Sequence, residues 1–89
     1  DPGRVLRAGI EMMAVAYDVG GPEDLIGALS AGDGGPDGQL EIIDHLWRTD
    51  HPRVVDLLEA IGTHHPDNKI AKSARKGLLK HRSFLANQR

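Results

Sequence analysis

The 89-residue sequence contains no cysteine, which excludes disulfide bonds, thiolate metal sites and catalysis by a thiol. It also contains no apolar run near the ~20 residues that a membrane-spanning helix needs, and no segment that resembles a signal peptide. β-Branched and polar residues do not alternate over any long stretch, so no strand is predicted. These absences predict an all-α, soluble, cytoplasmic protein without membrane contact.

Length and composition predict one small domain. Apolar residues make up 39% of the chain, which is ordinary for a soluble protein but low for a fully enclosed core. A domain of this size is only marginally able to fold alone, and the sequence begins with Asp1 rather than Met. We therefore expect residues 1–89 to form a single helical domain that is part of a longer chain.

The net charge of −2 hides an uneven distribution of charged residues. Residues 1–66 carry four basic and twelve acidic side chains, whereas residues 67–89 carry seven basic side chains and one acidic side chain. An acidic body is thus followed by a basic tail. Such an asymmetry steers association between copies or with other partners.

Four of the five prolines recur at nearly regular intervals and predict where helices begin. They stand at positions 22, 36, 52 and 66, separated by 14, 16 and 14 residues. Proline is favoured in the first turn of a helix, where its missing N–H would be unpaired anyway. Apolar residues follow each proline at helical spacing. The sequence therefore predicts five helices: a leading helix over 4–19, a helix pair over 22–51 and a second pair over 52–82.

The two predicted helix pairs match each other at a period of 30 residues. When 22–51 is laid over 52–81, identical residues coincide at five pairs: Pro22 with Pro52, Gly32 with Gly62, Pro36 with Pro66, Asp37 with Asp67, and His51 with His81; Leu40 also meets Ile70. Gly32 and Gly62 are expected to end the first helix of each pair, as glycine commonly does. A repeat of this length is typical of helical-repeat proteins.

This pattern resembles the HEAT-like (armadillo-like) helical repeats, especially their short thirty-residue form. The resemblance covers residues 22–82 and rests on architecture rather than on a motif. It implies antiparallel helical hairpins stacked into a fragment of a right-handed superhelix. It also implies a protein-interaction scaffold, since most members of the family have that role, while some bind nucleic acid and a few are enzymes.

The segment 4–19 is apolar around most of its circumference, because one apolar stripe contains Leu6 and Ile10 and another contains Met12. A helix of this kind is buried on more than one side. We expect one side to pack inside the domain and the other to meet a missing neighbour or a second copy of the chain. The residues assigned to this association face are Leu6, Ile10, Met12, Met13 and Tyr17.

Two similar segments, Thr-Asp-His-Pro at 49–52 and Thr-His-His-Pro at 63–66, suggest either a metal site or a pair of turns. Zinc and iron ligands on one helix need i,i+3 or i,i+4 spacing, which no two histidines have. A residue before proline is pushed out of the helical region. We predict that His51, His64 and His65 belong to turns, and that the chain binds no metal or other cofactor.

The segment 33–44 partly resembles an EF-hand calcium loop, with Asp33 and Asp44 at the first and last ligand positions. Gly35 supplies no ligand at the third position, and Pro36 interrupts the loop. Glycine, aspartate and proline are also the usual residues of turns. We expect a turn here and keep calcium binding as an alternative.

A row of basic side chains in the tail is the clearest functional signal. Lys69, Lys72, Lys76 and Lys80 are three or four residues apart on one edge of the last predicted helix, and Arg75 and Arg82 flank them. Such a row matches the spacing of phosphates and binds them through counterion release. No aromatic residue is interleaved for base stacking, so nucleic-acid binding is the second hypothesis rather than the first.

No serine lies in a nucleophile-elbow sequence, and no Gly-rich phosphate loop is present. We therefore expect a non-enzymatic helical-repeat module that binds another protein or the rest of its own chain. A homodimer is one form of such binding. A metal-dependent enzyme fragment is the third hypothesis.

Overall fold

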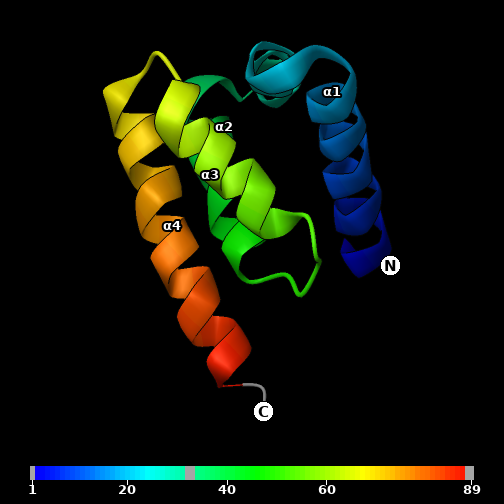
Figure 1. Cartoon of the computed structure of the whole chain (residues 1–89), viewed down its shortest axis with the longest axis vertical. Helices are drawn as coiled ribbons and strands as arrows, with labels where there is room; N and C mark the ends of the chain where they lie inside the picture. The colour runs from blue at the N-terminus through cyan, green and yellow to red at the C-terminus, as the bar shows by residue number, and fades with distance from the viewer. Residues whose placement is uncertain (1, 32–33, 88–89) are drawn as a thin grey trace.

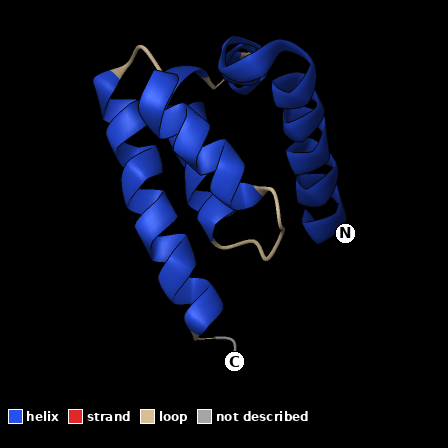
Figure 2. Cartoon of the chain, viewed as in Figure 1, coloured by secondary structure: helices blue, strands red, loops and turns tan. Residues whose placement is uncertain are grey.

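The computed structural model describes residues 2–31 and 34–87, with side chains described from Ala8 onward in the first helix. Its four helices are α1 (Pro2–Ser30), α2 (Gly35–Trp47), α3 (Val54–His64) and α4 (Asn68–Ala86). Figure 2 shows helices joined by short loops, with no strand among the residues described. The all-α prediction is confirmed, although the helix count is four where the sequence predicted five.

The difference in count arises at Gly21, where a kink with a non-helical backbone conformation divides α1 into two helical arms. Gly21 has φ 76° and ψ −165°, which is a conformation open to glycine and strained for other residues. Pro22 follows inside the same helix and lacks the N–H that would continue the hydrogen-bond ladder. The two helices predicted on either side of residue 21 are therefore two arms of one kinked helix, whose sharp turn is visible in Figure 1.

Helices α2 and α3 lie between α1 and α4 in the fold. Helix α3 packs against α4, α2 packs against α4, and α1 packs against both α3 and α2. Helices α1 and α4 do not contact each other in the described part of the chain. Figure 1 shows α1 and α4 on opposite sides of the molecule, with α2 and α3 between them.

The core lies where these four helices meet. Its fully buried large residues come from all four helices and include Ile10, Leu25, Leu29, Ile43, Leu46, Leu57, Leu58, Ile61 and Ile70. Two small residues of α4, Ala74 and Gly77, are also buried. A Cβ added at Gly77 would lie 3.5 Å from Ile43 Cγ2, in ordinary van der Waals contact. Small residues on α4 thus let α2 and α3 approach this helix closely.

Three of the four proline positions predict the start of a helix to within two residues. Pro36 lies in the first turn of α2, and Pro52 and Pro66 each stand two residues before α3 and α4. Helix α4 then begins with Asp67 as its N-cap, whose carboxylate accepts hydrogen bonds from the backbone N–H groups of the second and third helical residues.

The prediction that Gly62 ends a helix is wrong, because α3 continues to His64. Gly62 is buried inside the helix, and a Cβ placed on it would lie 2.7 Å from Arg75 Cγ. The Nη1 group of Arg75 also donates to the carbonyl oxygen of Gly62 at 2.9 Å. The glycine therefore serves the close crossing of α3 and α4. Its counterpart in the thirty-residue comparison, Gly32, lies outside the described residues.

Candidate functional site

The Thr-Asp-His-Pro segment forms the turn between α2 and α3. The hydroxyl of Thr49 donates to the carbonyl oxygen of His45, at 2.8 Å. Nδ1 of His51 accepts a hydrogen bond from the backbone N–H of Arg53 at 3.1 Å. The imidazole thus replaces a backbone acceptor across the proline, in the way that a short polar side chain closes a turn.

The Thr-His-His-Pro segment repeats this arrangement between α3 and α4. The hydroxyl of Thr63 donates to the carbonyl oxygen of Glu59 at 2.9 Å, and Nδ1 of His65 accepts from the backbone N–H of Asp67 at 3.0 Å. Because Nδ1 accepts, Nε2 of His65 carries the proton and donates to Oε1 of Gln39 at 2.7 Å. The prediction of turns is confirmed for His51 and His65, whereas it is wrong for His64, which is the last residue of α3.

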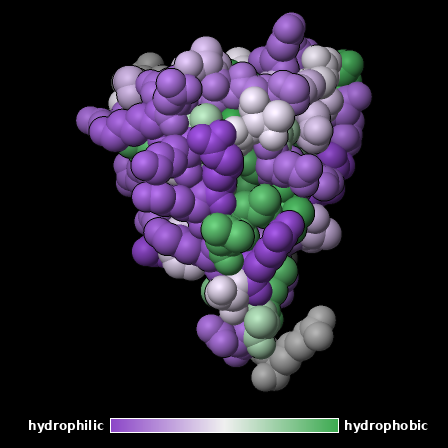
Figure 3. Space-filling view, turned by 60° about the vertical axis from the view of Figure 1, so that its left-hand side comes forward, coloured by the Kyte–Doolittle hydropathy of each residue, from purple (hydrophilic) through white to green (hydrophobic). Residues whose placement is uncertain are grey.

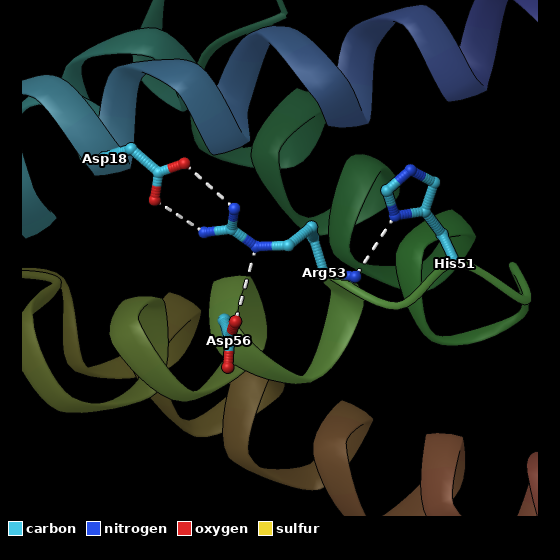
Figure 4. Close-up of polar contacts among 4 residues, drawn as sticks. All are labelled: Asp18, His51, Arg53 and Asp56. Atoms are coloured by element: carbon cyan, nitrogen blue, oxygen red, sulfur yellow. Dashed lines mark hydrogen bonds and ion pairs between the residues drawn. The ribbon is translucent and has the colours of Figure 1, made fainter.

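Arg53 joins the first of these turns to α1 (Figure 4). Its guanidinium forms two hydrogen bonds to the carboxylate of Asp18, at 2.7 and 2.9 Å, and its Nε lies 3.3 Å from Oδ2 of Asp56. The hydrogen bonds from Arg53 hold the pKa of Asp18 below its usual value. The same bonds raise the pKa of Arg53. This two-pronged pair fixes the first arm of α1 against the start of α3.

His81 plays a structural role at the C-terminal end of α2. It is buried, and its Nδ1 lies 2.9 Å from the carbonyl oxygen of Trp47, the last residue of α2. A carbonyl in the last turn of a helix has no partner within that helix, so the imidazole N–H caps it. Nε2 of His81 is buried without a hydrogen-bond partner. The side chain also stacks on Phe84, with ring centroids 6.3 Å apart.

The described residues do not bring together a metal-binding cluster. No group of three or more histidine, aspartate and glutamate side chains among them is placed to hold a metal ion. The nearest His–carboxylate approach on one helix joins Nε2 of His45 to Glu41 at 4.0 Å, and both side chains are exposed. The segment compared with a calcium loop is helical from Gly35, and Asp33 lies outside the described residues.

A polar cleft of about 220 Å³ lies between α1 and α3, beside Tyr17 and His64. Two of its lining groups are already engaged in holding the helices. The hydroxyl of Thr63 donates to a backbone carbonyl, and the carboxylate of Asp56 pairs with Arg53. We therefore assign the cleft to the joint between α1 and α3.

The residues predicted to form an association face lie on two different sides of α1. Ile10 and Met13 are buried in the core, and Tyr17 packs against it. Met12 points the other way and is 74% exposed. The side chain of Leu6 lies outside the described part of α1.

Met12 belongs to an exposed apolar stripe that sequence reasoning only partly identified. Val15 and Val19 are 61% and 82% exposed. Val15 lies three residues after Met12, and Val19 lies four residues after Val15, so the three share one side of the helix. We call Met12, Val15 and Val19 the α1 stripe. The sequence analysis did not include Val15 in this stripe, although its spacing of three residues from Met12 predicts that both lie on the same side of the helix.

The predicted basic row lies along α4 with all six side chains exposed. Among the described residues, no member forms an ion pair with a carboxylate. Two members have other contacts: Arg75 donates to Gly62, and Nζ of Lys80 lies 5.5 Å from the ring centroid of Trp47. The row remains available to an anionic partner over most of its length.

A shallow groove lies beside this row, where the end of α2 meets the second half of α4. We call it the α4 groove, and its lining residues are Trp47, Leu79, Lys80, Ser83, Phe84 and Asn87. Leu79 is 63% exposed, and Arg48 lies over the Trp47 ring at 4.9 Å. Figure 3 shows hydrophobic surface gathered on the lower part of this side of the molecule, bordered by hydrophilic residues. Sequence reasoning missed this groove, because Trp47 and Phe84 are distant in the chain.

No known family model matches the sequence, and neither a curated protein nor a solved structure shows significant similarity to it. Among the helices of the described residues, none combines the length and apolar character that crossing a membrane requires.

Proposed function

We propose that this chain is a non-enzymatic helical-repeat module that binds another protein, or the rest of its own chain, through the α1 stripe. The observation that carries the proposal is the exposure of Met12, Val15 and Val19 on the side of α1 that faces away from the core. Contiguous exposed apolar surface is typical of interaction sites in soluble proteins. Burying one such side chain contributes roughly 1.5–3 kcal/mol, so three of them supply a useful part of an interface.

Two features support a HEAT-like arrangement within this proposal. First, α1 pairs with α2 and α3 pairs with α4, while α1 also packs on α3 and α2 on α4. That is the order of contacts expected for two hairpins stacked in sequence. Second, Pro36 and Pro66 are thirty residues apart, and each lies at the start of the second helix of a pair. On this view the second arm of α1 is the first helix of a pair, and the stack continues as a right-handed superhelix.

The proposal is tested by photo-cross-linking in the full-length protein. A photoreactive amino acid replaces Val15 in one variant and Asn68, the exposed first residue of α4, in the control variant. We expect protein adducts from position 15 that are absent from position 68, and loss of these adducts when Met12→Glu is added. Equal adduct yields from both positions, or adducts that survive Met12→Glu, would contradict the proposal.

Nucleic-acid binding through α4 is the second candidate function. It is favoured by the exposure of the basic row and by the lack of carboxylate partners among the described residues. The substitutions Lys72→Glu and Lys76→Glu together should abolish a salt-sensitive complex with DNA or RNA in a gel-shift assay. Absence of any retardation by the unmodified chain at low salt removes this candidate.

The cytoplasmic location stays a prediction.

A further inference from the structure

We propose that the α1 stripe of one copy docks in the α4 groove of a second copy, so that chains associate head to tail. This inference rests on the proposed function and names the partner as the protein itself. It follows from the chemistry of the two surfaces and from their positions in the fold. It also follows from the charges that disfavour contact between two α1 stripes or between two α4 grooves.

The two surfaces carry opposite charge. Helix α1 contains two basic residues near its start, Arg4 and Arg7, and four acidic residues, Glu11, Asp18, Glu23 and Asp24, of which Asp18 is paired with Arg53. Along α4 (68–86), every charged side chain is basic, with no aspartate or glutamate. One of the acidic residues, Glu11, borders the α1 stripe, because it lines one shallow hollow with Met12 and Val15. The face of α1 that lacks a neighbour is thus apolar, with the carboxylate of Glu11 at its edge.

The α4 groove has the complementary pattern. Its apolar surface comes from Leu79, Phe84 and Trp47, and Lys80 and Arg48 hold positive charge over the Trp47 ring. The acidic group beside these residues is Asp44, which accepts a hydrogen bond from Nε1 of Trp47 and pairs with Arg48 at 3.4 Å. Lys80 has no carboxylate partner in the described part of the chain. An occupant with apolar side chains and a neighbouring carboxylate fits this groove.

The surfaces cannot meet within one molecule. Helices α1 and α4 make no contact with each other and lie on opposite sides of α2 and α3 (Figure 1). Their complementarity is therefore satisfied only between copies. Contact between different patches on the two partners is heterologous, and it leaves a free head on one copy and a free tail on the other.

A symmetric dimer through either surface alone is disfavoured by charge. Two copies of α1 packed stripe to stripe would offer Glu11 no cationic partner among the described residues beside the stripe, and two copies packed groove to groove would bring Lys80 towards Lys80. Like charges facing each other across an interface suppress that pairing. In the head-to-tail arrangement, Glu11 of one copy faces Lys80 of the next.

The test uses two variants, each of which removes one of the two surfaces. Met12→Glu places a charge in the α1 stripe and leaves the α4 groove intact, whereas Leu79→Glu does the reverse. Both residues are exposed, so neither substitution disturbs the core. Circular dichroism and a thermal melt verify that each variant folds. Lys80→Glu and Lys69→Glu form a matched pair with the same change of charge on the same helix, inside and outside the groove.

Sedimentation velocity over a concentration series at low salt gives the readout. We expect the unmodified chain to form species larger than a dimer, and Met12→Glu and Leu79→Glu each to be monomeric, with association weakened at least about tenfold. An equimolar mixture of these two variants should form a dimer and nothing larger, because one intact stripe and one intact groove remain. Lys80→Glu should weaken association and Lys69→Glu should not.

The outcomes separate this inference from the proposed function. If Met12→Glu dissociates the assembly but Leu79→Glu does not, the α1 stripe binds protein at another site, and only the head-to-tail inference is overturned. A monomeric mixture of the two variants overturns it as well. If the unmodified chain stays monomeric at every concentration, the inference fails, and the cross-linking experiment at position 15 decides the proposed function separately.

Discussion

Adding one methyl group at each of two buried glycines should shift stability in opposite directions. Gly62 in α3 and Gly77 in α4 both lie in helix interiors. Replacing glycine by alanine in a helix gains roughly 1 kcal/mol from backbone entropy and helix propensity. The surroundings of the two positions decide whether that gain survives.

At Gly77 the new Cβ lies 3.5 to 3.7 Å from atoms of Ile43, Leu58 and Trp47, which is ordinary contact. A buried methyl group there contributes about 0.8 kcal/mol at most. We expect Gly77→Ala to raise the free energy of unfolding by about 1–2 kcal/mol. The melting temperature of a domain of this size should rise by at least about 4 °C.

At Gly62 the new Cβ lies 2.7 Å from Arg75 Cγ, close to the stem of that side chain. Relieving the overlap moves Arg75 and disturbs its hydrogen bond to the Gly62 carbonyl oxygen. Overpacking of this kind costs about 1–3 kcal/mol, and the lost hydrogen bond costs about 1 kcal/mol more. Gly62→Ala should therefore be less stable than Gly77→Ala by about 2–4 kcal/mol.

Urea unfolding followed by circular dichroism at 222 nm measures both variants, with an unchanged m value as the condition for comparing them. The control is Gly62→Ala in an Arg75→Ala background, where Cγ is absent and the nearest remaining atoms lie 3.4 Å or more from the new Cβ. In that background the substitution should be neutral or stabilising. Equal stability of Gly62→Ala and Gly77→Ala in the unmodified chain would refute the close crossing of α3 and α4.

Three further predictions concern the polar contacts. Because Arg53 lowers the pKa of Asp18, the contribution of that carboxylate to stability is present above its unfolded pKa of about 4 and is lost as the pH falls through its folded pKa. The gap in urea midpoint between the unmodified chain and Asp18→Asn should therefore shrink from pH 7 to pH 3, and a constant gap would contradict the pairing. His65→Ala should lower the free energy of unfolding by about 1–3 kcal/mol, and His65→Asn should recover part of it by accepting from the same backbone N–H in an Asx turn; equal losses would exclude the turn as the cause. His81→Ala should cost about 2–4 kcal/mol through a cavity and an uncapped helix end, measured in the same assay, and a loss under 1 kcal/mol would be inconsistent with its burial.

Several features of this fold follow from signals that act within one helical turn. Prolines and an N-cap aspartate mark where α2, α3 and α4 begin, because they satisfy or remove the N–H groups that the first turn leaves unpaired. The Thr-x-His-Pro segments close their own turns through bonds that span at most four residues. Local chemistry of this kind is readable from the residues alone.

The tertiary structure decided the features that depend on which surfaces meet. Both sides of the first arm of α1 are apolar, and only packing determines that Ile10 turns inward while Met12 stays exposed. Glycine is typical of helix ends, but Gly62 lies inside α3, where it allows the close approach of α4. The pairing of Asp18 with Arg53, 35 residues away, depends on the same packing. A sequence specifies where helices begin through local hydrogen bonding, whereas the choice of neighbours comes from the combined fit of all the apolar faces, which no single segment contains.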